Sequence, residues 1–375
     1  MAKLKLITVV GTRPEIIRLA EIIKLADQIY DHVLVHTSQN YDYNLNEIFF
    51  KDLGLRAPDF FLGVAGEHLG ETIGNVISRS YEVFLKEMPD ALLVLGDTNS
   101  VLCTIAAKRL KIPIFHMEAG NRCFDQNVPE EINRKISDHI SDINLPYTEH
   151  SRRYLLSEGF RKDHIFVTGT PLFEVIKKNQ KNIDASNVLQ QLKIQPKKYI
   201  VVSAHREENI DNENNFSNLI DALNGVAETY QLPIIFSTHP RTQKRITVQK
   251  IKFNDLIINM PPFGFFDYIN LQKNSFCVLS DSGTISEESS IVGFPAISIR
   301  TSTERPEAID AGCIVLGGIT RSEILNALST TLQTNNTTTR QLPWEYKVED
   351  VSIRVIRIIQ SYTAIVNKVI WGKAR

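Results

Sequence analysis

Acidic, imidazole and guanidinium side chains gather at a few points of this 375-residue chain, each directly after a short apolar run. The densest group lies in residues 116–134, HMEAGNRCFDQNVPEEINR, which follow the apolar run Ile112–Phe115. Carboxylates beside arginines at the end of a strand can move protons or bind an anion. A solvated loop closed by a capped helix would have the same composition, so this stretch alone leaves both interpretations open.

The same placement recurs along the chain for five titratable side chains. They are Asp97, Glu118, His205, His239 and Asp281. A single residue of this kind could be a helix cap, but five placed alike are hard to explain as caps alone. In doubly wound parallel sheets, ligands bind outside the carboxyl ends of the strands. We therefore expect these side chains to line a ligand site.

Residues 11–15, GTRPE, have the pattern of an anion site at a helix N-terminus. Thr12 and Glu15 have capping-box spacing, and Pro14 suits a first helical turn. Arg13 is then held where the backbone already favours anions. A plain cap with an exposed arginine explains the same residues equally well.

The second anion pattern is Asp281–Glu288, DSGTISEE. A strand, a Ser-Gly-Thr turn and a helix start would let a phosphate approach the backbone at Gly283 and meet the amides of the first turn. Thr284 and Glu287 again have capping-box spacing, so a capped structural helix is the alternative. The chain has no P-loop motif and no GxGxxG after a strand, which disfavours ATPase and NAD-dependent activities.

The elements that must position these residues are apolar runs typical of buried strands, alternating with helical stretches. The expected strands are Lys5–Val10, His32–Thr37, Ala91–Leu95, Ile114–Met117, Ile143–Leu145, Ile165–Val167, Tyr199–Val202, Pro233–Phe236, Phe276–Leu279, Ala296–Ile299 and Cys313–Leu316. This alternation in each half predicts an α/β protein with two doubly wound parallel sheets. We expect domains over residues 1–170 and 171–349, followed by an amphipathic helix within residues 350–375. Two facing sheets would place both sets of polar residues in one inter-domain cleft.

Composition excludes several kinds of partner. The net charge of −1 provides no basic face for nucleic acid or an anionic membrane. The four cysteines have no metal-ligand spacing, so no metal site is expected. The apolar run Leu6–Val10 is too short for a signal peptide, and no segment has about 18 uninterrupted apolar residues. These features favour a cytoplasmic protein that does not insert into a membrane.

Seven motifs, taken together and in order, resemble one family closely. They are GTRPE (Gly11–Glu15), GDT (Gly96–Thr98), EAG (Glu118–Gly120), PEEINR (Pro129–Arg134), the pair His205-Arg206, DSG (Asp281–Gly283) and TERPEA (Thr303–Ala308). The family is that of the non-hydrolysing UDP-N-acetylglucosamine 2-epimerases. The resemblance implies two Rossmann-like domains in the GT-B arrangement, with the C-terminal helix returning to the first domain. It also implies a homodimer that binds a UDP-2-acetamido sugar and UDP and needs no cofactor.

The resemblance implies roles for twelve residues of this chain. The catalytic set is Asp97, Glu118, Glu130 and His205. The substrate-binding set is Arg13, Arg18, Tyr268, Ser282, Gly283, Thr284, Glu288 and Arg305. Within the second set, Arg13 and the Ser282–Thr284 turn would hold the diphosphate, and Glu288 would accept the ribose hydroxyls. Tyr268 would lie near the nucleotide, and Arg305 would line the pocket with His205.

Three stretches resemble one subgroup of the family. They are Ile17–Leu19, Asn40–Asn44 and Asn121–Asp125. The subgroup inverts C2 of UDP-2-acetamido-2,6-dideoxy-L-talose to give UDP-N-acetyl-L-fucosamine for capsule or O-antigen. Arg18 stands where the family usually has lysine. The loop at residues 39–42 departs from the common Gln-His-Arg, which argues against activation by a second UDP-GlcNAc.

Other functions fit the same motifs. A UDP-GlcNAc/UDP-ManNAc 2-epimerase is the first alternative, and a hydrolysing epimerase that releases N-acetylmannosamine is close to it. A GT-B glycosyltransferase would use the same donor site but would need an acceptor groove, for which the sequence has no apolar or basic patch. A regulator that only binds a nucleotide sugar would have no need of Asp97, Glu118 and Glu130 together.

Overall fold

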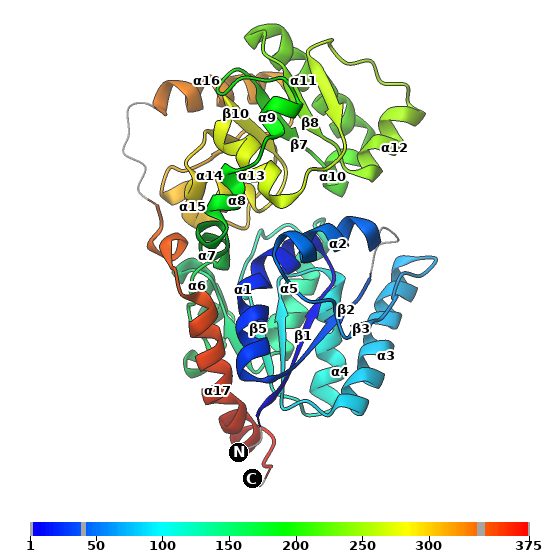
Figure 1. The fold of residues 1–375 in the computed structure, drawn as a ribbon, viewed down its shortest axis with the longest axis vertical. Helices are drawn as coiled ribbons and strands as arrows, with labels where there is room; N and C mark the ends of the chain where they lie inside the picture. The colour runs from blue at the N-terminus through cyan, green and yellow to red at the C-terminus, as the bar shows by residue number, and fades with distance from the viewer. Residues whose placement is uncertain (1–2, 39–42, 336–341, 374–375) are drawn as a thin grey trace. The chain divides into compact units, whose positions relative to one another are not determined.

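The computed structural model describes residues 3–38, 43–335 and 342–373 (Figure 1). It divides into two compact units: unit 1 holds Met1–Lys178 and Lys347–Arg375, and unit 2 holds Asn179–Tyr346. The chain therefore crosses between the units twice. The sequence suggested a first boundary at residue 170, whereas the division falls after Lys178. Helix α7 (Pro171–Lys178) belongs to unit 1 because it packs against α1 (Arg13–Ile29).

Within the described residues, unit 1 is built around a six-stranded parallel sheet in the order β3-β2-β1-β4-β5-β6. Its strands are β1 (Lys5–Val10), β2 (Asp31–His36), β3 (Phe60–Phe61), β4 (Ala91–Leu95), β5 (Ile114–Met117) and β6 (Ile143–Leu145). Its remaining helices are α2 (Tyr43–Asp52), α3 (Leu69–Glu87), η1 (Asn99–Leu102), α4 (Cys103–Arg109), α5 (Pro129–Ile140), α6 (Glu149–Ser157), η2 (Lys162–His164) and α17 (Val351–Val369). The central strands are buried on both faces, which explains their continuous apolar runs.

The C-terminal helix α17 completes unit 1 by packing against α1 and α7 (Figure 1). Its buried stripe includes Val351, Val355 and Ile359, which are fully buried at helical spacing. Two polar contacts fix it in place: the Tyr30 hydroxyl donates to a carbonyl of α17, and Ser352 donates to a buried carboxylate of α7. The predicted amphipathic helix is therefore a structural part of unit 1.

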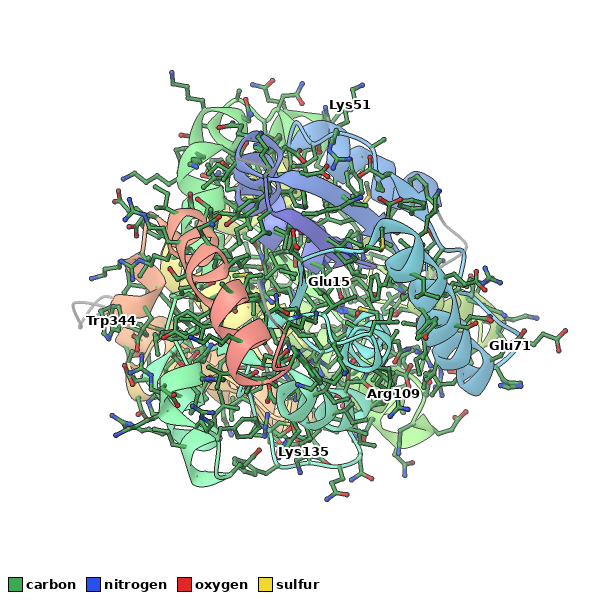
Figure 2. The ribbon with its side chains drawn as sticks, turned by 90° about the horizontal axis from the view of Figure 1, so that it is seen from below. Glu15, Lys51, Glu71, Arg109, Lys135 and Trp344 are labelled. Carbon is green, nitrogen blue, oxygen red and sulfur yellow. The ribbon has the colours of Figure 1, made fainter. Side chains whose placement is uncertain are left out.

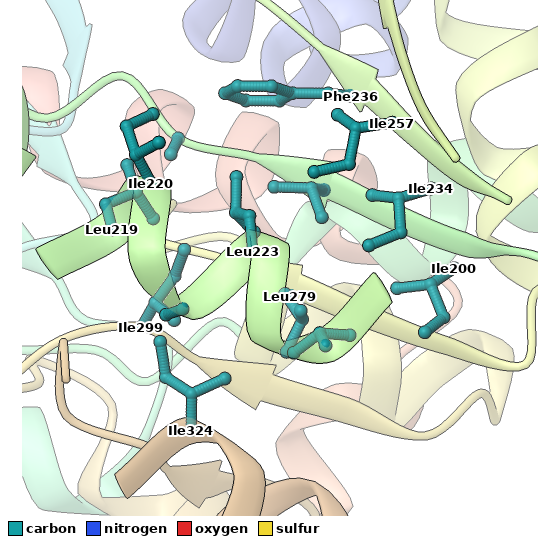
Figure 3. Packing of buried hydrophobic residues seen from close by; sticks show 14 of the residues in the cluster. Ile200, Leu219, Ile220, Leu223, Ile234, Phe236, Ile257, Leu279, Ile299 and Ile324 are labelled. Atoms are coloured by element: carbon teal, nitrogen blue, oxygen red, sulfur yellow. The ribbon is translucent and has the colours of Figure 1, made fainter. Parts of the chain in front are cut away.

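Unit 2 contains a second six-stranded parallel sheet, in the order β12-β11-β10-β7-β8-β9. The strands are β7 (Ile200–Ser203), β8 (Ile234–Ser237), β9 (Ile257–Met260), β10 (Cys277–Ser280), β11 (Ala296–Ser298) and β12 (Val315–Leu316). The helices are α8 (Gln180–Asp184), α9 (Val188–Gln191), α10 (Glu207–Ile210), α11 (Glu213–Tyr230), α12 (Pro240–Val248), α13 (Phe265–Asn274), α14 (Ile285–Val292), α15 (Pro306–Asp310) and α16 (Arg321–Thr334), and η3 (Trp344–Lys347) spans the second crossing. Figure 3 shows one face of this sheet, where Leu219 and Leu223 of α11 pack on strand residues such as Leu279.

The two sheets have the same strand order relative to their own first strands, the order of a doubly wound Rossmann sheet. The order reverses between β1 and β4 in unit 1 and between β7 and β10 in unit 2. The predicted fold class, two Rossmann-like parallel sheets of the GT-B type, is confirmed. Across the described ranges, no helix is both long and apolar enough to span a bilayer.

Three details differ from the sequence-based expectation. Ile165–Val167 is not a strand, because only Ile165 forms a bridge, to Asn144. Strands β3 and β9 were not expected; both lie at sheet edges, where side chains are half exposed and no continuous apolar run is needed.

Candidate active site

In unit 1, two of the predicted catalytic carboxylates end neighbouring strands. Asp97 lies two residues after β4, and Glu118 directly follows β5. The strands pair in parallel with Leu95 opposite Met117, and the Gly96 N–H donates to the Met117 carbonyl at 3.0 Å. Both carboxylates therefore stand at the carboxyl edge of the sheet, beside the point where its strand order reverses.

Glu118 is 8% exposed and has a φ of +64°, a left-handed conformation that is uncommon for a residue other than glycine. Arg18 of α1 reaches it across 100 positions of sequence, with Nη1 2.5 Å from Oε2. The Asn121 amide donates to its other oxygen at 3.2 Å. The guanidinium of Arg18 also lies over the Tyr147 ring, 5.8 Å from its centroid. Glu118 is thus held by one side chain from α1 and one from its own loop.

Asp97 is held by helix α5. Arg134 donates to its carboxylate, with Nη2 2.6 Å and Nε 2.8 Å from Oδ2. Arg134 also pairs with Glu131 at 2.8 Å, and Glu131 accepts the N–H groups of Cys123 and Phe124. Burial alone would raise the pKa of Glu131, but these N–H donors and the guanidinium hold that pKa below its ordinary value. A chain of buried charge therefore joins Asp97 to the loop after Glu118.

Sequence reasoning assigned no role to Glu131 or Arg134, although their i,i+3 spacing at a helix start is a signal for an ion pair. It predicted a capping box of Thr12 and Glu15, which the start of α1 confirms. The Glu15 carboxylate accepts the Gly11 and Thr12 N–H groups.

Glu15 also accepts a hydrogen bond from the hydroxyl of Thr98, the residue after Asp97. It lies in the interior of the view in Figure 2, whereas Lys51 and Glu71 lie at the rim. Burial raises the pKa of Glu15 to about 7, despite its three donors, and the nearby Asp97 charge acts in the same direction. Glu15 thus joins the loop after β1 to the loop after β4.

Two further predicted residues begin helices of unit 1. Arg13 is the first residue of α1 and is half-buried, with its guanidinium 5.8 Å from the centroid of the Phe49 ring. Glu130 is half-buried in the first turn of α5, beside the Asp97–Arg134–Glu131 chain. Asn40, Tyr41 and Asp42, which motivated the subgroup assignment, lie outside the described residues.

In unit 2 the predicted residues gather around Asp281, which follows β10 and is fully buried. Its carboxylate accepts the backbone N–H of His205 at 3.0 Å and that of Arg206 at 3.0 Å. The His205 side chain is 42% exposed, and its Nδ1 lies 3.4 Å from Asp281. Its ring centroid is 6.1 Å from that of His239. Asp281 therefore ties the loop after β7 to the loop after β10, where this sheet reverses its order.

The Ser-Gly-Thr turn is organised by hydroxyl groups. Ser282 and Thr284 share a hydrogen bond of 2.9 Å between their hydroxyls, and the Thr284 hydroxyl donates to Glu288 at 2.6 Å. A Cβ on Gly283 would stand 2.1 Å from Oε1 of Glu304 and 3.4 Å from the Arg206 guanidinium. A side chain at position 283 would therefore require a shift of the Glu304 carboxylate, which pairs with Arg206 and Arg300, or of the turn itself.

The predicted capping box at Thr284 and Glu287 is wrong. Thr284 makes no side-chain cap bond, and Glu287 instead pairs with Arg305 at 2.7 Å. Both partners are at most 2% exposed, so the Arg305 charge is engaged inside unit 2. Tyr268, on α13, is half-buried, and burial raises the pKa of its hydroxyl.

The structure brings the predicted residues together in two groups, one in each unit. The unit 1 group is Arg13, Arg18, Asp97, Glu118 and Glu130, and the unit 2 group is His205, Tyr268, Ser282, Gly283, Thr284, Glu288 and Arg305. The part of the chain that the structure describes contains no cluster of His, Cys, Asp or Glu arranged to hold a metal ion. The first group offers carboxylates paired with arginines, and the second offers hydroxyls at the start of a helix.

Known proteins resemble the whole chain. A family model described as UDP-N-acetylglucosamine 2-epimerase matches residues 24–360. UDP-N-acetylglucosamine 2-epimerase of Methanocaldococcus jannaschii is 37% identical over 87% of this chain and 91% of its own length. A structure of UDP-N-acetylglucosamine 2-epimerase from Rickettsia bellii is 47% identical, with a TM-score of 0.93 over 99% of this chain and all of that one. The M. jannaschii enzyme in complex with UDP-GlcNAc and UDP is similar with a TM-score of 0.89, 35% identity and coverage of 96% and 100%.

Proposed function

This chain belongs to the UDP-N-acetylglucosamine 2-epimerase family, and we propose that it converts UDP-2-acetamido-2,6-dideoxy-L-talose to UDP-N-acetyl-L-fucosamine. The family activity is an isomerisation, so the chain is a UDP-sugar 2-epimerase acting on substrates of the UDP-GlcNAc type. The observation that carries the mechanism is that Asp97 and Glu118 end neighbouring strands and are each paired with an arginine.

The chemistry explains why carboxylates are needed. The hydrogen on C2 is not adjacent to a carbonyl, so its direct removal is very costly. In an elimination route the C1–O bond to UDP breaks and C2 loses its proton, which leaves a 2-acetamidoglycal. A proton then adds to the opposite face of C2, and a UDP oxygen re-forms the bond to C1. Carboxylates stabilise the positive charge that develops at C1 and carry the proton.

We assign the proton transfers to the carboxylates Asp97, Glu118 and Glu130, with His205 as the fourth catalytic group. Two observations support Asp97 and Glu118. Ion pairs position both carboxylates at the sheet edge. Helix α5 also holds the main chain of Asp97, because Asn133 donates to the Asp97 carbonyl at 2.9 Å. Groups held this firmly can keep the alignment that proton transfer requires.

The leaving UDP needs fixed positive charge and amide donors. We assign its diphosphate to Arg13 and the Ser282–Thr284 turn, where two hydroxyls stand at the start of α14. Glu288 is the candidate for the ribose hydroxyls, since its carboxylate is already presented by Thr284 and Gln272 at 2.6 Å each. Arg18, Arg305 and Tyr268 complete the proposed substrate-binding set.

The choice of sugar rests on residues that depart from the common family pattern. Arg18 and Asn121 are two of them, and both donate hydrogen bonds to Glu118. A change in the groups that orient Glu118 would change how its carboxylate meets the sugar, and so which sugar is the better substrate. A 6-deoxy sugar presents a methyl group where glucose has a hydroxyl, and an apolar pocket discriminates between them by only about 1–3 kcal/mol.

The test is incubation with each sugar nucleotide in heavy water, with C2 followed by NMR. We expect deuterium to enter C2 with both substrates and the specificity constant to favour the 6-deoxy L-talose derivative. The Glu118→Gln variant is the control for contaminating activity, because it should exchange C2 at least about a hundredfold more slowly.

Each alternative has its own outcome. A specificity constant that favours UDP-GlcNAc would overturn the sugar assignment and leave the epimerase activity standing. Release of free N-acetylmannosamine would identify a hydrolysing enzyme instead. Transfer of the sugar to an acceptor without C2 exchange would identify a glycosyltransferase.

Three further features belong to this proposal. The product would serve capsule or O-antigen synthesis, the enzyme would work in the cytoplasm where UDP-sugars are made, and it would be a homodimer. The support for the dimer is the family resemblance. Sedimentation velocity at micromolar concentration tests it, because a 42.5 kDa species alone would contradict it.

A further inference from the structure

His116 stands at the centre of a buried network that neither the sequence motifs nor the proposed mechanism uses. It lies on β5, two residues before Glu118. It is 1% exposed. Buried imidazoles between acceptors are uncommon and call for an explanation.

Both ring nitrogens of His116 face oxygen atoms that can only accept. Nε2 lies 2.8 Å from the carbonyl of Gly96, the residue before Asp97. Nδ1 lies 2.9 Å from Oδ1 of Asp138 on α5, an ion-pair distance with a poorly aligned N–H. A neutral imidazole carries one N–H, so it would turn a lone pair toward one of these two oxygens. The imidazolium turns an N–H toward the carbonyl and places its positive charge beside the carboxylate.

Asp138 extends the contact to the loop that follows Glu118. It accepts the Gly120 N–H at 3.1 Å and the Arg122 guanidinium at 2.7 Å. Arg122 in turn makes a two-pronged pair with Glu158, each N–O distance being 2.7 Å. With His116 charged, the cluster holds two cations and two anions, which is the balance that buried ions need.

The turn that this cluster holds is one that needs support. Glu118 and Gly120 both have positive φ, and a Cβ on Gly120 would stand 2.4 Å from the Ser151 carbonyl. Such backbone strain persists only where the surroundings over-determine it. Through Gly96 on one side and Asp138 and Gly120 on the other, His116 connects the turn of Asp97 to the turn of Glu118.

We propose that His116, as an imidazolium at neutral pH, is a positioning residue that fixes the spacing between Asp97 and Glu118. The inference rests on the proposed function, because it assumes that these two carboxylates act on the substrate. The charged groups around His116 favour its protonated form: Asp138 faces it from α5, Glu118 follows on its own strand, and Arg122 and Arg18 balance these two. Burial alone would lower the pKa of His116, but Asp138 outweighs burial and raises it.

The first experiment reads the charge state directly. In wild-type protein labelled with ¹⁵N-histidine, we expect both ring nitrogens of His116 to carry protons at pH 7, with the signal assigned by its loss in His116→Gln. A neutral tautomer at pH 7 would overturn the proposal. This readout does not depend on any substrate, so it remains decisive even if the proposed function fails.

The second experiment measures the effect on rate. His116→Gln should lower kcat about a hundredfold, the cost of misplacing catalytic groups by about 1 Å, and should leave KM nearly unchanged. In the wild type, kcat should fall as pH rises through the raised pKa of His116, and this limb should vanish in the variant. Asp138→Asn should lower kcat in the same way, and it keeps the test valid if His116→Gln does not fold.

The matched control is His139→Gln, which changes an exposed histidine on the same helix as Asp138 and should retain wild-type kcat. If His116→Gln and Asp138→Asn are folded and keep kcat and the pH profile of the wild type, His116 is only a packing residue. If wild type turns over no UDP-2-acetamido sugar, the proposed function fails while the charge state of His116 is still measured.

Discussion

The two units share one strand order but differ in the side chains that follow their strands. In unit 1 the ends of β4 and β5 carry carboxylates, each joined to a buried arginine. In unit 2 the buried carboxylate of Asp281 accepts hydrogen bonds from backbone N–H groups, and the turn after it carries hydroxyl groups. On the proposed function, the same topology would support two kinds of chemistry, proton transfer and anion binding, with the few residues after each strand deciding between them. Mutations in unit 1 should consequently lower the rate, whereas mutations in unit 2 should weaken UDP binding.

The largest expected effect is on the rate, from unit 1. Glu118→Gln and Asp97→Asn should each lower kcat at least about a hundredfold, since general acid–base groups contribute on that scale. Calorimetry should find their affinity for UDP unchanged. Near-normal turnover in either variant would remove that residue from the catalytic set. A loss of UDP affinity would mean that the unit 1 carboxylates also contribute to UDP binding.

Gly283→Ala should be the most damaging small change in unit 2. Its Cβ would collide with the buried Glu304 carboxylate, so either that ion-paired side chain or the Ser-Gly-Thr turn must shift. We expect UDP affinity to fall about a hundredfold, the loss of more than one charge-assisted hydrogen bond. The matched control is Gly74→Ala on α3, where a Cβ meets nothing within 4 Å and UDP affinity should not change. Equal affinities for the two variants would mean that the turn does not bind phosphate.

Ser282→Ala removes one hydroxyl and leaves the backbone in place. Loss of a single hydrogen bond to a charged group should weaken UDP binding about tenfold. Arg13→Ala asks whether unit 1 contributes to the same binding, and we expect a loss of similar size. If calorimetry finds UDP affinity unchanged in both variants, the diphosphate site is wrong.

The smallest effect concerns stability and pH. The folded-state pKa of Glu15, about 7, lies above its ordinary value of 4.5, so its contribution to stability is full below about pH 4.5 and is lost as pH rises through 7. Between pH 5 and pH 8 the wild type should therefore lose about 3 °C more in Tm than Glu15→Gln, which cannot ionise. Parallel Tm curves for the two proteins would contradict this account of unit 1.

Sequence patterns predicted the central strands well because those strands are buried on both faces. They failed at the sheet edges, where Ile257–Met260 is a half-exposed strand and Ile165–Val167 is apolar without being one. In the site, the patterns located the carboxylates but not their partners. Arg18 and Glu118 are 100 residues apart, and no local signal pairs them. The capping-box spacing at Glu287 misled for the opposite reason, because Arg305, a distant partner, outcompeted the local one.

Helix α17 determines the order in which the two units can fold during translation. Unit 2 is one continuous segment, whereas unit 1 is completed only by residues 347–375, which are synthesised after all of unit 2. Until α17 arrives, the sides of α1 and α7 that it covers are open, and Tyr30 and Glu174 lack their hydrogen bonds to α17. The second half of the chain should thus fold before the first half is finished, the reverse of the usual N-terminal-first sequence. Nascent chains stalled before Val351 should accordingly protect unit 2 from protease while unit 1 is still cleaved.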